Sequence, residues 1–544
     1  MKLIKKIYSL ALLGVLAVSL NSCDFSGLTD AADDFGVLVE LEPINTSVTV
    51  QLIDAATGEF ISNNVTANFG GENSSDIIDI YSDPISQREV GDGILNFGID
   101  NSVAPSESNP AQIQLRLQAN GYLSAVKTIS VADEGANNFT INMIKKSAPP
   151  SGVEIEEGVA GSADESGVTN EDINIELSNT TDNSGEETGS SVEVAKGSMF
   201  TDQNGVALTG SLESSAIYYS PNEALAVEAV PDELVENVGD SAVTLLGAMD
   251  LTITDASGKI ATNVQGGSGK IAANGNQLND GSYILNFVLN GSTYRELQQL
   301  LRLAFISPTT AERVILYSNP QITNLPDGRV SLRYALNSEI FRSAALVYFS
   351  EQPCNSSLTF NRNGNEGIIP VRITERGFFR SADLQAGRNV LQLRNITRGS
   401  KTIRATLAND IYEESIDVCG TSNPTVDLPA PPAETIDSAI IEVGLTCPSG
   451  QKITVTDVPS ASILYRRAGT EGQGKSWRTA RNIQWNQNED DNGRVEGGSF
   501  EISNVINGVN YDFIIKIDNE NRKRTVTING STTSYTEQVA DICE

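Results

Sequence analysis

Residues 113–122 read Ile-Gln-Leu-Arg-Leu-Gln-Ala-Asn-Gly-Tyr, the clearest secondary-structure signal in the chain. Apolar and polar side chains alternate strictly, which is the pattern of a β-strand with one buried and one exposed face. The Asn-Gly-Tyr at its end predicts a sharp corner. Similar runs occur at 47–54, 247–255 and 440–445. We therefore predict a mostly β fold made of tandem β sandwiches.

Length and composition agree with several small β domains. The chain has 544 residues, which predicts three or four domains, and its 46 glycines suit turns better than long helices. Acidic and proline-rich stretches mark the expected linkers between the sandwiches.

The charge balance restricts the possible functions. Asp and Glu number 70 against 37 Lys and Arg, which gives a net charge of −33, and there is no histidine. The missing histidine excludes Ser-His-Asp and Cys-His nucleophile pairs and His-ligated metals. The acidity argues against a nucleic-acid partner. We expect no enzyme, no cofactor and no metal site, although carboxylate chemistry stays open.

The N-terminus has the features of a secretion signal. Lys2, Lys5 and Lys6 precede an apolar run at 7–20, which is too short to span a membrane comfortably. The run ends in Leu20-Asn21-Ser22-Cys23, which resembles the lipobox of bacterial lipoproteins. The resemblance implies a signal peptide at 1–22, lipid attachment at Cys23, and anchoring in the outer membrane or at the cell surface of a Gram-negative bacterium.

Acidic residues follow the cysteine within a predicted tether at 23–45. This stretch resembles the acidic export signal of surface lipoproteins from Bacteroidetes-type bacteria. The residues concerned are Asp24, Asp30, Asp33 and Asp34.

The first predicted domain covers residues 46–146. Val48-Thr49-Val50, a Thr57-Gly58 turn and the 113–122 strand with its Gly-Tyr corner resemble the carboxypeptidase-regulatory-like (transthyretin-like) domain. That resemblance implies a small β sandwich without catalysis of its own.

Residues 147–190 are predicted to be an acidic linker. The stretch 151–193 contains twelve acidic and no basic residues, and such a block usually stays extended. Two alternatives stay open: a calcium-collecting loop, and one strand at 173–177 inside the linker.

The region 191–350 is predicted to be a β module with one short helix. Its order is a strand, an Asp202-x-Asn204-Gly205 turn, a second strand, and a tyrosine-containing strand that ends at Pro221. This order resembles the module of cartilage-intermediate-layer-type proteins. The helix is expected at 293–304, with Thr293 and Glu296 as a capping box.

Cysteines define the last two domains. Cys354, Cys419, Cys447 and Cys543 allow three pairings, and a proline-rich linker at 421–438 lies between the second and third. We therefore predict the pairs 354–419 and 447–543. They would close a β domain at 351–420 and a β domain at 439–544, the latter similar to fibronectin type III modules.

A local excess of basic and aromatic residues near the end of the chain predicts a ligand face. Its members are Trp477, Trp485, Arg466, Arg467, Arg478 and Arg481. Such a face could meet an acidic glycan or the acidic linker of another subunit, whereas solvated strands and turns are the structural alternative.

The function expected from these features is that of a membrane-anchored, surface-displayed lipoprotein with an adhesive, scaffold or matrix role and no catalysis. The alternative is a glycan-binding lipoprotein of a polysaccharide-uptake system that uses Trp477 and Trp485. Expected partners are the membrane, through the lipid, and an extracellular glycan or other surface proteins.

Overall fold

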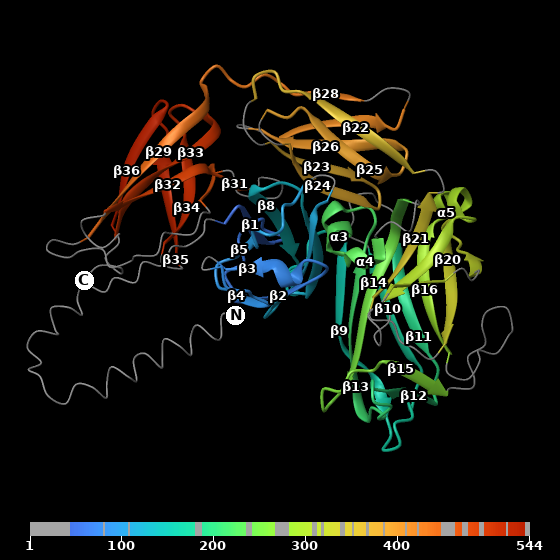
Figure 1. The fold of residues 1–544 in the computed structure, drawn as a ribbon. Coiled ribbons are helices and arrows are strands. Elements are labelled where there is room, and N and C mark those ends of the chain that lie inside the picture. The colour runs from blue at the N-terminus through green and yellow to red at the C-terminus, as the bar shows by residue number, and fades with distance from the viewer. Residues whose placement is uncertain are drawn as a thin grey trace, which may run out of the picture. The chain divides into compact units, whose positions relative to one another are not determined.

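The computed structural model describes residues 44–538 except 80–81, 107–108, 180–187, 236–241, 267–281, 307–312, 317–319, 338–342, 351–352, 366–368, 385–386, 408–410, 421–423, 448–462, 470–476, 489–493 and 518–519. Strands dominate these residues and form four β domains, which confirms the predicted fold class (Figure 1). The predicted signal peptide, Cys23 and the acidic tether as far as residue 43 lie outside the described residues. No helix in this part of the chain is long and apolar enough to cross a membrane.

Domain 1 is a sandwich of two four-stranded sheets. The sheets have the orders β3-β5-β1-β8 and β4-β2-β6-β7. The strands are β1 (Thr46–Asp54), β2 (Val65–Gly70), β3 (Ile77–Ile78), β4 (Gln87–Val90), β5 (Ile94–Ile99), β6 (Ala111–Ala119), β7 (Ala125–Val131) and β8 (Gly135–Met143). Strand β1 pairs antiparallel with β5 and parallel with β8, so β8 forms an edge of its sheet.

The alternating stretch at 113–122 behaves as predicted. Ile113, Leu115 and Leu117 of β6 are fully buried, while the polar residues between them face away from the core. Gly121 turns the chain with φ +79°, a conformation that favours glycine. The Tyr122 hydroxyl then donates a hydrogen bond of 3.0 Å to the carboxylate of Asp54, which ties this corner to the end of β1.

Domain 2 consists of a six-stranded sheet, a five-stranded sheet and a small two-stranded sheet. Their orders are β18-β17-β21-β14-β13-β9, β10-β11-β16-β20-β19 and β12-β15. The strands are β9 (Val153–Ala163), β10 (Ile173–Asn179), β11 (Thr188–Val194), β12 (Ser198–Thr201), β13 (Gly210–Tyr219), β14 (Ala242–Asp255), β15 (Asn263–Gly266), β16 (Ser282–Asn290), β17 (Leu301–Ile306), β18 (Arg313–Leu316), β19 (Gln321–Asn324), β20 (Arg329–Asn337) and β21 (Ser343–Ser350).

The prediction of an acidic linker at 147–190 is wrong for the described residues, whereas the alternative of a strand at 173–177 is confirmed by β10. Strand β9 pairs along its length with β13, and β10 pairs with β11, so both belong to domain 2. Ile173, Ile175 and Leu177 enter its core. The acidic residues of β9 lie on an edge strand, where charge protects unpaired backbone groups from association with other chains. The negative charge of β9 therefore marks the edge of a sheet, and not a linker between domains.

The helices of domain 2 also differ from the prediction of a single one at 293–304. Helix α5 (Gly291–Leu297) is capped by Asn290, whose side chain accepts a hydrogen bond from the Ser292 N–H, so the Thr293 capping box is wrong. The chain re-enters a sheet as β17 because Leu301 and Leu303 are buried there with a period of two. Two short helices were not predicted, α3 (Ala224–Ala229) and α4 (Asp232–Val235).

Domain 3 is a smaller sandwich that a disulfide closes. Its sheets have the orders β25-β22-β28 and β24-β23-β26-β27. The strands are β22 (Cys354–Asn361), β23 (Ile369–Glu375), β24 (Phe378–Leu384), β25 (Val390–Ile396), β26 (Gly399–Thr406), β27 (Ile411–Val418) and β28 (Thr425–Asp427). Cys354 and Cys419 are bonded, with their Cα atoms 6.0 Å apart, which confirms that pairing and links the two sheets.

The proline-rich linker predicted at 421–438 is shorter than expected. Strand β28 pairs in parallel with β22, and Val426 and Leu428 are buried in the domain 3 core. Strand β29 of domain 4 then begins at Thr435.

Domain 4 has the sheet orders β32-β33-β29-β36 and β31-β30-β34-β35. Its strands are β29 (Thr435–Thr446), β30 (Ile463–Arg467), β31 (Arg478–Thr479), β32 (Arg481–Asn488), β33 (Arg494–Ile506), β34 (Asn510–Ile517), β35 (Glu520–Thr527) and β36 (Thr532–Gln538). Cys447 is disulfide-bonded, and its predicted partner Cys543 lies outside the described residues.

Domain 1 forms an ion pair with each of the other three domains. Lys127 binds Asp232 of domain 2 at 2.9 Å. Arg388 of domain 3 lies 3.4 Å from Asp133. Arg466 of domain 4 lies 3.1 Å from Glu59. Domain 1 is therefore the hub that the three later domains contact.

Candidate functional site

Trp477 lies in the contact between domains 4 and 1. Its side chain is only 3% exposed, and its ring lies 5.6 Å from that of Phe60. Ile94, Leu464 and Ile514 complete this apolar cluster. Gln51 of β1 donates a hydrogen bond of 3.2 Å to the backbone carbonyl of Trp477. The indole therefore joins two domains and cannot serve as an exposed stacking platform.

Arg466 is buried in the same contact. Its guanidinium carbon lies 4.4 Å from the centre of the Trp477 ring, and its side chain is 3% exposed. Besides the ion pair with Glu59, its Nε lies 3.9 Å from a carboxylate oxygen of Asp512. A cation over an indole in a dry environment is attracted to the negative face of the ring. Arg466 therefore stabilises domain docking.

The predicted ligand face is consequently divided. Trp485 is half-buried against the core of domain 4, and Arg467 is half-buried at the end of β30 without lining the hollow described next. Only Arg478 and Arg481 line that hollow together with Trp477. Trp477 is therefore not an exposed sugar platform, because inter-domain packing buries it, and the six predicted residues do not lie together on one face.

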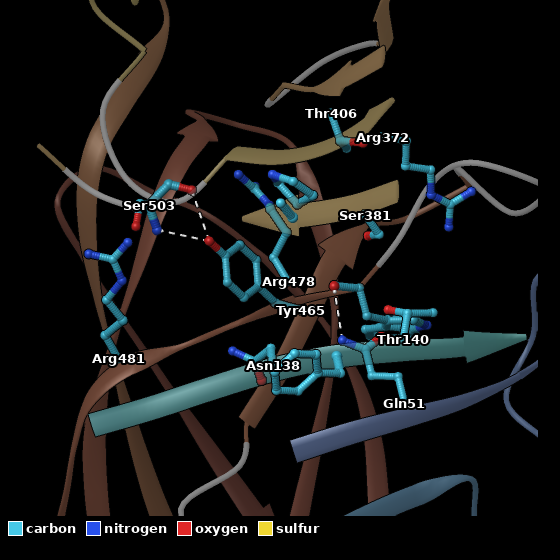
Figure 2. Close-up of a pocket in the computed structure, with 14 residues that line it drawn as sticks. Gln51, Asn138, Thr140, Arg372, Ser381, Thr406, Tyr465, Arg478, Arg481 and Ser503 are labelled. Carbon is cyan, nitrogen blue, oxygen red and sulfur yellow. Dashed lines mark hydrogen bonds between the residues drawn. The ribbon is translucent and has the colours of Figure 1, made fainter. Parts of the chain in front are cut away.

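Arg478 and Arg481 line a hollow where domains 1, 3 and 4 meet, which we name the arginine cleft (Figure 2). Its volume is about 130 Å³. The lining residues come from β1 and β8 in domain 1, from β23, β24 and β26 in domain 3, and from strands β30–β33 and residue 477 in domain 4. They are Gln51, Asn138, Phe139, Thr140, Pro370, Arg372, Ser381, Ala382, Thr406, Tyr465, Trp477, Arg478, Arg481 and Ser503.

Hydrogen bonds fix the domain 4 wall of the arginine cleft. The Tyr465 hydroxyl donates to the Ser503 carbonyl and accepts from the Ser503 N–H, both at 3.0 Å (Figure 2). Arg478 lies over the Tyr465 ring at 4.6 Å and donates to the carbonyl of Asn504 at 3.1 Å. These contacts hold one guanidinium in a defined position beside the hollow.

The lining of the arginine cleft is cationic in a strongly acidic chain. It contains three arginines and no carboxylate. Across the part of the chain that the structure describes, no carboxylate lies within 4 Å of the guanidinium nitrogens of Arg372, Arg478 or Arg481. The positive charge of the cleft is therefore available to an anionic ligand.

Two more distant carboxylates balance part of this charge. Burial raises the pKa of Glu228 in α3, an effect that the charge of Arg372 and a hydrogen bond from Asn142 oppose. A hydrogen bond from Ser438 lowers the pKa of Glu501, and the charge of Arg481 acts in the same direction. Neither carboxylate lines the cleft.

Buried polar atoms at the arginine cleft have unused hydrogen-bonding capacity. Arg481 Nη2 and the indole Nε1 of Trp477 are buried donors without a partner in the described structure, and Gln51 Oε1 is a buried acceptor in the same condition. Leaving a buried polar atom unpaired costs about 1–3 kcal/mol. These two donors, one of which belongs to Arg481 itself, lie in a lining with three arginines and favour an acceptor with negative charge.

A second hollow of about 460 Å³ continues from the arginine cleft between domains 1 and 3, and we name it the outer hollow. The two hollows share Asn138, Phe139, Ser381 and Ala382. The outer hollow adds Arg388, which pairs with Asp133, and the exposed Arg394. Its size lies within the range of about 300–1,000 Å³ that is usual for ligand sites.

The arginine cleft and the outer hollow can hold a ligand through charge and hydrogen bonds. No group of three or more His, Cys, Asp or Glu residues that could hold a metal ion occurs within the described ranges. In the acidic stretch, Asp164 accepts hydrogen bonds from the N–H groups of Ser166 and Val168. In the predicted turn after it, Asp202 accepts in the same way from Asn204 and Val206. These carboxylates cap turns.

Sequence reasoning missed Gln51, Asn138 and Arg372 as members of a site. Gln51 and Asn138 lie on the paired strands β1 and β8 of domain 1, Arg372 lies on β23 of domain 3, and nothing in the local sequence of these polar residues distinguishes them. The only available signal was the basic excess around Arg478 and Arg481.

Comparisons with known proteins give no family. No family model and no curated protein matches this chain. A solved structure described as the Bacillus anthracis TIE protein is similar over 71% of this chain at 10% sequence identity, with a TM-score of 0.15. The chain spans 57% of the length of that structure.

Proposed function

We propose that this chain is a lipid-anchored, surface-displayed scaffold or adhesin of a Gram-negative bacterium, without catalysis. The support from the sequence is the order of a basic segment, an apolar segment and Cys23, followed by an acidic tether. The carboxypeptidase-regulatory-like and cartilage-intermediate-layer-like resemblances of the first two domains are in keeping with such a role.

The observation that carries the proposal is the hub position of domain 1. This domain follows the tether directly, and it contacts domains 2, 3 and 4 through Asp232, Arg388 and Arg466. Gln51 and Trp477 are hydrogen-bonded although 426 positions separate them in the chain. Domains held in this way present their loops from a stiff body, which is what a scaffold or an adhesin requires.

Lipid anchoring is tested by growing a Gram-negative host that expresses the chain with labelled palmitate. The wild-type chain should incorporate label and remain with the membrane fraction. Cys23→Ser should lose both properties because it removes the thiol at which the lipobox resemblance places the lipid. Ser22→Ala is the matched control, since it keeps a small residue before the cysteine and should stay labelled. Label that persists in Cys23→Ser would overturn the anchoring.

Display and adhesion are tested on intact cells. Protease added outside should remove the chain, and cells that express it should attach to surfaces or to one another more than cells with the Cys23→Ser variant. Turnover of a glycoside panel that a single Asp or Glu substitution abolishes would contradict the non-catalytic role.

A further inference from the structure

The arginine cleft and the outer hollow are bordered by two sheet edges. Strand β8 pairs only with β1, and β24 pairs only with β23, so each ends its sheet. Residues 138–140 of β8 and 381–382 of β24 line the arginine cleft, and the outer hollow is lined from the same two strands. The outer N–H and C=O groups of an edge strand can pair with another extended chain.

Other elements hold these two edges in place. Helix α3 lies against both β8 and β24, and the Asn142 amide of β8 donates to both carboxylate oxygens of Glu228 in this helix at 2.8 Å. Arg388 and Asp133, which line the outer hollow, bridge domains 3 and 1. The two edges are therefore held apart at defined positions, and they do not pair with each other.

The side chains along this space select negative charge. Arg372, Arg478 and Arg481 lie at the inner part, and Arg394 lies at the outer part, where the lining carboxylate of Asp133 is paired with Arg388. The buried donors Arg481 Nη2 and Trp477 Nε1 lack acceptors in the described structure. A carboxylate would satisfy such donors with charge-assisted hydrogen bonds, which are about twice as strong as neutral ones.

We propose that the arginine cleft and the outer hollow together bind an extended acidic peptide segment of another surface protein. The peptide backbone pairs with the edge of β8 or β24, and acidic side chains reach Arg478 and Arg481. The lining favours a peptide over a sugar because two of its three aromatic rings are covered, those of Trp477 and Tyr465 at 3% and 2% exposure, and the third, Phe139, is half-buried against the core of domain 1. Strand addition at a sheet edge takes its affinity from the main chain and its specificity from the side-chain sites.

This inference deepens the proposed adhesive role, on which it rests, by naming the class of partner. It is tested on the purified full-length lipoprotein in detergent, with a labelled peptide of alternating threonine and glutamate and fluorescence polarisation as the readout. The matched peptides contain glutamine in place of glutamate, or proline in place of alternate threonines. We expect binding of the first peptide, and a loss of at least about tenfold in affinity with either control peptide, because one removes charge and the other removes backbone donors.

Protein variants locate the site. Arg478→Gln combined with Arg481→Gln should weaken binding of the glutamate peptide by at least about tenfold. Arg467→Gln makes the same change of charge outside the cleft and should leave the affinity unchanged. Circular dichroism and the melting temperature show whether each variant is folded, and Arg394→Gln, at an exposed position, provides a second variant should the double substitution unfold domain 4.

The outcomes separate this inference from the function on which it rests. Equal binding of the proline-containing peptide would refute strand addition. Tighter binding of oligogalacturonate than of the glutamate peptide would replace it with an acidic-saccharide site. No binding of any probe would refute the site itself, while palmitate labelling at Cys23 and cell attachment would still decide the scaffold role.

Discussion

Replacement of Trp477 by alanine is expected to release domain 4 from domain 1. A buried tryptophan covers about 150–250 Å² of surface. At about 25 cal/mol per Å² this burial corresponds to about 4–6 kcal/mol. Its apolar partners are divided between domain 1 (Phe60 and Ile94) and domain 4 (Leu464 and Ile514).

We assign about half of this free energy, about 2–3 kcal/mol, to docking, since about half of the apolar partners come from domain 1. The docked population relative to the undocked one should therefore fall roughly 30- to 160-fold in Trp477→Ala. The hydrogen bond from Gln51 ends on the backbone carbonyl, so the substitution does not delete its acceptor.

Hydrogen–deuterium exchange measures this loss. Amides of residues 55–61, next to Phe60, should exchange faster by up to that factor in Trp477→Ala, while strand β6 in the core of domain 1 keeps its protection. Trp485→Ala is the control, because it removes the same side chain from the core of domain 4 itself. That variant should speed exchange in β32 and β33 and leave residues 55–61 unchanged.

The reasoning is refuted if residues 55–61 exchange at the same rate in Trp477→Ala and in the wild type while the variant remains folded. Such a result would mean that the ion pair of Arg466 with Glu59 holds the domains without the indole.

Three further predictions concern other positions. Burial raises the pKa of Glu228, so the folded chain keeps the proton of this carboxyl at pH values above the ordinary pKa of 4.5, where the unfolded chain has lost it. The contribution of Glu228 to the free energy of unfolding therefore falls as the pH rises from 4.5 towards the pKa of the folded state. The melting temperature of Glu228→Gln relative to that of the wild type should therefore increase as the pH rises from about 4 to 7, and a difference that does not change with pH would contradict this. Cys354→Ser opens a disulfide between cysteines 65 positions apart and should cost about 4 kcal/mol in the denaturant unfolding of domain 3; a shift below about 1 kcal/mol would contradict it. Burial and, after it, the Asp54 carboxylate raise the pKa of Tyr122 to about 12, so the folded hydroxyl keeps its proton while the unfolded one ionises, and stability falls between about pH 10 and 12. Spectrophotometric titration of Tyr122→Phe against the wild type should remove one late-titrating tyrosine, and an identical titration would refute the assignment.

The alternation of apolar and polar residues was sufficient to predict the strands that have one buried face. In β6, Ile113, Leu115 and Leu117 are buried as their alternation predicted. The same kind of prediction failed for β9, because the acidic residues of this edge strand have the composition that is typical of a solvated linker. It also failed in helix α5, where the capping residue was Asn290 and the following leucines belong to a strand.

The sequence by itself determined the β class, the Cys354–Cys419 pair and the basic character of the residues around Arg478, because these properties follow from spacing, charge and alternation along one stretch of chain. Only the tertiary structure decided that Trp477 and Arg466 are buried between domains, since their partners Phe60 and Glu59 lie about four hundred positions earlier. It likewise assembled the arginine cleft from three domains, because inter-domain packing depends on the shapes of surfaces that no local sequence pattern records.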